Sequence, residues 1–137
     1  MAKKSQMPKQ TDLRQLKPRG PTGRLRAICM ALPEAEERET WEIPTYRIRG
    51  KIFALQSAID EREAVWCKAQ EGSQELLVQA DPGRFFVPPY LGHKGWVGMW
   101  LDKKADWTEV AELVRRSYCL IAPKKLAAKL TSQVFPG

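Results

Sequence analysis

Three short runs rich in β-branched and aromatic residues follow one another between residues 40 and 68, with only turns between them. The runs are 40–43, 46–55 and 64–68. Their composition is typical of strands. Because strands that pair in parallel need a crossover of about a dozen residues or more, strands joined by shorter turns must pair antiparallel. The sequence therefore predicts an antiparallel sheet at the centre of the fold.

Two later segments complete the predicted sheet. They cover residues 85–87, which two prolines bring to an end, and residues 96–101. Gly50 interrupts the run 46–55 and predicts either a tight hairpin turn or a bulge at that point. Taken as one strand each, the five segments predict a five-stranded sheet.

The strongest helical pattern begins at Asp106, which can cap the helix, and continues to residue 121. Glu112 and Arg116 stand four residues apart on its polar side and are expected to form an ion pair. The apolar stripe of this helix consists of Trp107, Val110, Val114 and Ile121. A proline ends the helix, and a final helical turn is expected over residues 124–130.

Two further segments show helical spacing. The first covers residues 22–32, with Thr22 positioned as its cap. Its apolar stripe consists of Leu25, Ile28, Cys29 and Leu32. A short helix over residues 73–80 is expected to turn Leu76, Leu77 and Ala80 toward the core.

The predicted order of elements is α-β-β-β-α-β-β-α. Since a sheet of this kind must bury one face, we expect the helices to cover that face in a two-layer α+β sandwich. A chain of 137 residues has the common size of one domain. We therefore expect a single domain over residues 21–137, preceded by a flexible basic arm over residues 1–20, where apolar periodicity is almost absent.

Charge, cysteines and apolar stretches narrow the class of protein. Of the net charge of +7, residues 1–20 carry +5 and the other 117 residues carry +2. No apolar stretch approaches the roughly 20 residues of a membrane span, and the N-terminus lacks a secretory signal, so we expect a cytoplasmic protein. The three cysteines form no CxxC pair and His93 is the single histidine, so the sequence predicts no metal site and no cofactor. We expect reduced, buried thiols at Cys29, Cys67 and Cys119.

Several segments of the chain, in the right order, resemble one known family. They are LPEAEE at 32–37, PTYRIRGKIFA at 44–54, DPGRFFVPPY at 81–90, GHKGWVG at 92–98, SY at 117–118 and APK at 122–124. On these segments, which lie within residues 22–130, the chain is identified as a member of the YjbR/MmcQ family. The basic arm lies outside the resemblance.

This resemblance implies a fold and a function. The fold is a small α/β sandwich like that of type III secretion chaperones, and the function is DNA binding through a double-wing arrangement of hairpins that touches the duplex. The family pattern contains no catalytic motif to carry over. His93 and Cys67 also have no nucleophile or activating base beside them in the chain. We therefore expect no enzymatic activity.

The first candidate wing surrounds Gly50. Arg47, Arg49 and Lys51 place three cations around a glycine at a strand turn, where they could hold phosphates. The alternative is a solvated hairpin whose charges prevent edge-to-edge strand pairing.

The second candidate wing is the loop over residues 90–95. Two glycines bracket His93 and Lys94, so this backbone needs unusual freedom or a close approach to another group. The loop could be the second wing, the mouth of a pocket lined by Tyr90 and Trp96, or a simple connection between strands.

The strand 96–101 suggests a different function. Its alternation places Trp96 and Trp100 on one face, with a gap over Gly98, and the other apolar side chains on the opposite face. Both tryptophans could stack on a base or a flat ligand, or they could belong to the core or to a dimer contact. A cleft of this kind would be lined by Tyr46, Tyr90, His93, Trp96 and Trp100.

The sequence thus leaves two hypotheses. The first is a DNA-binding protein with little sequence preference, whose phosphate contacts are Arg47, Arg49, Lys51, His93 and Lys94. The sequence leaves the oligomeric state open, with a monomer favoured. The second is a protein-interaction or small-ligand module that uses the aromatic cleft. The acidic run from Glu34 to Glu42 would repel phosphates beside a wing, so we expect it at a different edge of the fold.

Overall fold

The computed structural model describes residues 20–59, 62–102 and 105–134. The predicted basic arm lies outside these residues, apart from Gly20, which begins the first helix. None of the helices within the described ranges is long and apolar enough to cross a membrane.

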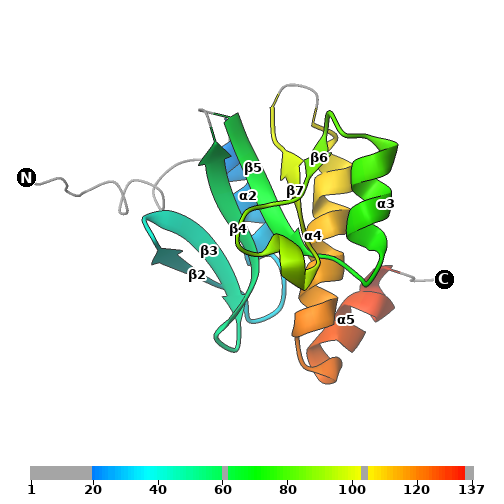
Figure 1. Ribbon diagram of the computed structural model, residues 1–137. Helices are drawn as coiled ribbons and strands as arrows, with labels where there is room; N and C mark the ends of the chain where they lie inside the picture. Colours follow the sequence, from blue (N-terminus) through cyan, green and yellow to red (C-terminus); the bar gives the residue numbers. More distant parts are fainter. Residues whose placement is uncertain (1–19, 60–61, 103–104, 135–137) are drawn as a thin grey trace, which may run out of the picture.

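A six-stranded antiparallel sheet forms the centre of the molecule (Figure 1). Its order is β2-β3-β4-β5-β7-β6, and each pair of neighbours runs antiparallel. The strands are β2 (Glu36–Thr40), β3 (Ile43–Ile48), β4 (Lys51–Ile59), β5 (Arg62–Lys68), β6 (Phe85–Phe86) and β7 (Trp96–Trp100). The α+β class with an antiparallel sheet is confirmed, with six strands rather than the five predicted.

The additional strand comes from the division of the run 46–55. Arg49 and Gly50 both have positive φ angles, of 53° and 84°, so they form the kind of two-residue turn that joins neighbouring antiparallel strands. A bulge is present as well, a few residues away. Tyr46 pairs with Ala54 while the next residue of β3 pairs with Ile52, which leaves Phe53 without a partner in β3. Both interpretations of the Gly50 interruption therefore apply, at different positions.

The prediction of a strand over residues 40–43 is wrong. Trp41 and Glu42 form the turn between β2 and β3, with φ angles of 54° and 64°. The acidic segment before them, Glu36–Thr40, is itself the edge strand β2. Edge strands of natural proteins often carry charged side chains, which discourage pairing with the strands of other chains. A segment rich in glutamate is therefore compatible with the edge position of β2.

Within the described residues, four α-helices accompany the sheet: α2 (Gly20–Met30), α3 (Ser73–Ala80), α4 (Trp107–Ile121) and α5 (Lys124–Val134). α2 and α4 pack on the same face of the sheet (Figure 1). In α2, Leu25 and Cys29 are fully buried, as the stripe predicted. Thr22 lies within the helix instead of capping it. Its hydroxyl donates to Glu63 (3.2 Å) and accepts from Gln56 (2.9 Å).

α4 agrees closely with its predicted pattern. The carboxylate of Asp106 accepts hydrogen bonds from the backbone N–H groups of Thr108 and Glu109, which caps the helix. Val110 and Val114 are fully buried against the sheet. This helix therefore forms the centre of the second layer.

α3 differs from its prediction. None of its residues is buried, and Leu76, which was expected to face the core, has 69% of its surface exposed. Only Leu77 and Val78 pack partly against the core. The spacing of its apolar residues does not determine how so short a helix is oriented toward the core, and α3 stands apart from α4 (Figure 1).

The two faces of β7 bury different clusters, as its alternation predicted. Val97 and Met99 join the core beneath the helices. Trp96 packs on the other face, in a smaller cluster with Leu55, Ala64 and Trp66. Both faces of the central strands are therefore covered.

The hydroxyl of Ser117, in α4, connects the helix to the sheet at the bulge. It donates to the carbonyl oxygen of Phe53 (2.6 Å) and accepts from the backbone N–H of Lys68 (3.0 Å). Since β4 and β5 pair through Ala54 and Cys67, Phe53 and Lys68 would form the next step of the ladder. Instead of bonding to each other, the carbonyl of Phe53 and the N–H of Lys68 both bond to the hydroxyl of Ser117.

Replacement of Ser117 by alanine should lower the free energy of unfolding by about 1–3 kcal/mol, because a buried carbonyl and a buried N–H would both lose their partner. Chemical denaturation measures this change. The control is Ser57→Ala in β4, whose hydroxyl makes no hydrogen bond within the described ranges and whose loss should change stability by less than about 0.5 kcal/mol. Equal effects of the two substitutions would contradict the bridging role.

Candidate nucleic-acid interface

The two predicted wings lie at the same end of the sheet (Figure 1). The first is the turn between β3 and β4, and the second is the loop before β7, which contains the 3-10 helix η1 (Gly92–Lys94). Ala54 of β4, Cys67 of β5 and Val97 of β7 form one row across the sheet. At this end of the sheet, only β5 separates the start of β4 from the start of β7. Two strand spacings separate the wings, which is about 10 Å.

Three cations of the first wing have different surroundings. The guanidinium of Arg47 donates to the carbonyl of Gly50 (3.1 Å) and to the hydroxyl of Thr40 (2.9 Å), so this side chain braces the turn. Arg49 donates to the carboxylate of Glu34 (2.8 Å). Lys51 is exposed, and no ion pair of its side chain is found within the described part of the chain.

The acidic run lies beside this wing, contrary to the expectation that it would occupy a different edge. Glu34 pairs with Arg49, and Glu36 of β2 stands opposite Arg47 in the strand register. The sequence did not reveal this, because β2 was not recognised as the neighbour of β3. The hydrogen bond from Arg49 lowers the pKa of the Glu34 carboxyl. The charge of Arg49 is thus largely neutralised.

The second wing is held in place from α3. The side-chain amide of Gln74 donates to the carbonyl oxygens of Gly92 (2.8 Å) and Trp96 (2.5 Å), at the two ends of the loop. His93 and Lys94 are exposed on η1 between these anchors. The two glycines are required as predicted: Gly95 has a φ angle of 85°, and a methyl group on Gly92 would overlap the side chain of Val87.

One further cation was missed by the sequence analysis. Lys68, the last residue of β5, lines a cavity of about 450 Å³ together with His93 and Lys94. A lysine at the end of a strand gives no functional signal in the sequence. Its place beside the second wing follows only from the antiparallel pairing of β5 with β7.

The structure does not bring the five residues of the predicted aromatic cleft together. Tyr46 is fully buried in the core beneath the helices, where burial raises the pKa of its hydroxyl. Trp96 is 7% exposed and packs on the opposite face of the sheet. Tyr90 projects into solvent with 87% of its surface exposed. These side chains cannot surround one ligand.

The expected gap over Gly98 is filled by Phe86 of β6. Phe86 pairs with Gly98 in the strand register and stacks on Trp100, with ring centroids 4.3 Å apart. The guanidinium of Arg62 also lies over the ring of Trp100, 4.0 Å from its centroid. The glycine therefore makes room for a ring of the protein itself, and the two tryptophans serve packing.

Gly98→Ala should destabilise the protein by about 1–3 kcal/mol, because the added methyl group would overlap the Phe86 ring in a packed cluster. Thermal or chemical unfolding measures the loss. Gly83→Ala is the matched control, since a methyl group there meets only ordinary contacts. In the Phe86→Ala background, Gly98→Ala should cost much less; an undiminished cost would show that Phe86 is not the cause.

Comparisons with known proteins bear on this fold and site. The sequence model of the family described as YjbR matches residues 30–120. Among solved structures, the crystal structure of the Deinococcus radiodurans protein DR2400, which has a DUF419 domain, matches with a TM-score of 0.69 and 24% sequence identity. This match covers 84% of the present chain and 91% of that chain. A search of curated proteins finds no match. The structural likeness supports the α+β fold described above.

Proposed function

The chain belongs to the YjbR family, and we propose that it is a non-enzymatic module that binds the phosphate backbone of DNA between its two wings. The observation that carries this proposal is the juxtaposition of the β3–β4 turn and the η1 loop at one end of the sheet. Both segments are short, anchored at their ends and exposed at their tips. Rigid turns of this kind lose little conformational freedom when they bind.

Only some of the predicted cations are suited to contact phosphates. Lys51, His93 and Lys94 are exposed, and no carboxylate partner of theirs is found within the described residues. Arg47 supports the turn from within, and Arg49 becomes available only when it leaves Glu34. Contacts to phosphates position a protein without reading bases, so the proposed binding has little sequence preference.

Lys51→Gln and Lys94→Gln should each weaken binding to a short DNA duplex by about fivefold, the equivalent of about 1 kcal/mol. Each should also reduce the slope of log K against log salt concentration by about 1, because one fewer counterion is released. Fluorescence anisotropy of a labelled duplex at several salt concentrations measures both quantities.

Arg38→Gln is the control for this experiment. Arg38 is an exposed cation on the edge strand β2, outside both wings, and its replacement removes the same charge. If all three variants weaken binding equally, only the total charge matters and the wings have no special role. A binding constant that is independent of salt would overturn the proposed phosphate contacts themselves.

Glu34→Gln should increase the affinity for the duplex by about three- to fivefold, because it removes a carboxylate from the wing and releases Arg49. Glu39→Gln makes the same change of charge on β2, opposite Pro44 and away from Arg49. Its effect in the same anisotropy assay should be smaller. Equal gains from the two variants would refute the specific role of the Glu34–Arg49 pair.

A further inference from the structure

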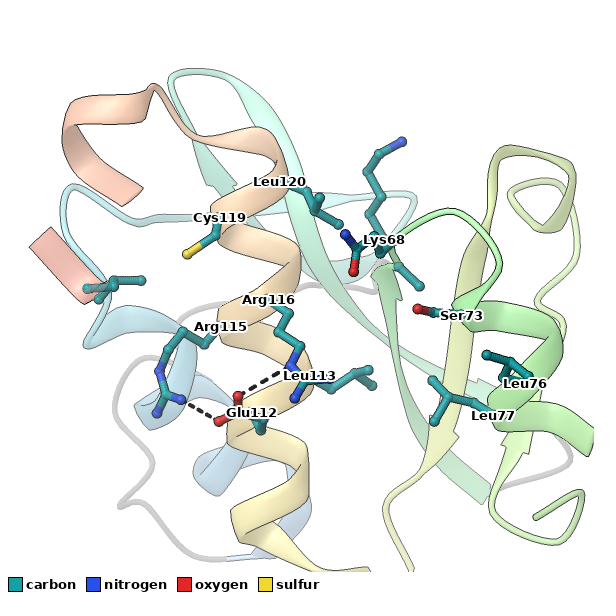
Figure 2. A pocket seen from close by; sticks show the side chains of 13 residues that line it. Lys68, Ser73, Leu76, Leu77, Glu112, Leu113, Arg115, Arg116, Cys119 and Leu120 are labelled. Atoms are coloured by element: carbon teal, nitrogen blue, oxygen red, sulfur yellow. Dashed lines mark hydrogen bonds and ion pairs between the residues drawn. The ribbon is translucent and has the colours of Figure 1, made fainter. Parts of the chain in front are cut away.

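An open cavity of about 440 Å³ lies between α3 and α4 (Figure 2), and at the end of β5 it adjoins the cavity beside the second wing. One wall is α3, the other wall is α4 with a contribution from α5, and the end of β5 closes one side. This volume is within the range of about 300–1,000 Å³ that is usual for small-molecule sites. The cavity exists because α3 buries none of its residues and stands apart from α4.

The walls of this cavity are mainly leucine side chains. Leu113 of α4 points across the trough toward Leu77 of α3 (Figure 2). Leu76 and Leu120 line the same trough and are 69% and 44% exposed. Such exposed apolar side chains gathered around one hollow favour an apolar ligand, because burial would remove their surface from water.

The charged residues of the cavity are mainly basic. Lys68, Arg115 and Arg116 line it together with one acidic residue, Glu112, which leaves an excess of two positive charges. Glu112 holds both arginines, with N–O distances of 2.6 Å to Arg115 and 3.3 Å to Arg116. The carboxylate holds Arg116 along α4, with its guanidinium beside Leu113 at the edge of the trough (Figure 2).

From this combination we infer that the trough between α3 and α4 binds a small amphipathic anion, with an apolar chain between the leucines and an acidic head group against Arg116. The leucine walls supply the surface that an alkyl chain needs, and the cations supply the charge complementary to a carboxylate. The phosphates of a DNA strand are charged and would not bury the apolar surface of these leucines. The ligand therefore differs from the one proposed for the wings. The inference does not depend on DNA binding.

Decanoate, below its micellar concentration, is a suitable probe, and isothermal titration calorimetry of the full chain measures its binding. Two matched probes separate the parts of the proposal: acetate has the head group without the chain, and decylammonium has the chain with the opposite charge. We expect decanoate to bind at least tenfold more tightly than either. Equal binding of decanoate and decylammonium, or no binding of decanoate, would overturn the inference.

Two variants test whether decanoate binds in the trough. Arg116→Gln should weaken decanoate binding by about tenfold, since a hydrogen bond between two charged groups is lost. Leu76→Gln should weaken it as well, through the chain. Both side chains are largely exposed, so neither change should affect folding, which the unfolding midpoint checks. Arg38→Gln on β2 is the control for charge; if it weakens binding as much as Arg116→Gln does, the trough is not the site.

Discussion

The buried hydroxyl of Ser117 is the contact on which the arrangement of the two layers depends. Phe53 lies at the bulge between β3 and β4, one residue beyond the last pair of β4 with β5, and without this hydroxyl its carbonyl and the N–H of Lys68 would remain without a partner. The next residue, Tyr118, stacks edge-to-face on Phe53 and donates to the carbonyl of Pro33 (2.6 Å). Two consecutive residues of α4 thus fasten the helix to the sheet and to the connection between α2 and β2.

These contacts of Ser117 and Tyr118 lie at the end of the sheet that carries both wings. Lys51 begins β4 two residues before the bulge, and Lys68 ends β5 at the hydrogen bond to Ser117. β5 in turn pairs with β7, whose first residue follows the η1 loop. The same hydroxyl therefore bonds both to β4, which follows the first turn, and to β5, which pairs with the strand after the second turn. The proposed binding surface and the fold therefore share one anchor.

The sequence predicted those features that depend on local pattern. The cap and stripe of α4, the two faces of β7 and the family resemblance all follow from residue spacing. It did not predict features that depend on which strands become neighbours. The pairing of β2 with β3 sets Glu34 against Arg49, and the pairing of β6 with β7 fills the gap over Gly98. The trough beside α3 depends on the orientation of one short helix, for which the spacing of three apolar residues gave the wrong answer.

The central claim is that one end of the sheet, with both turns, forms the DNA contact. An NMR titration of the ¹⁵N-labelled full chain with a short duplex tests this claim most directly, because each backbone amide reports separately. We expect the largest shift changes at Gly50 and Lys51 in the first turn and at Lys94 and Gly95 in the second, with β2 almost unaffected. Changes confined to other parts of the surface, or to only one of the two turns, would contradict the account.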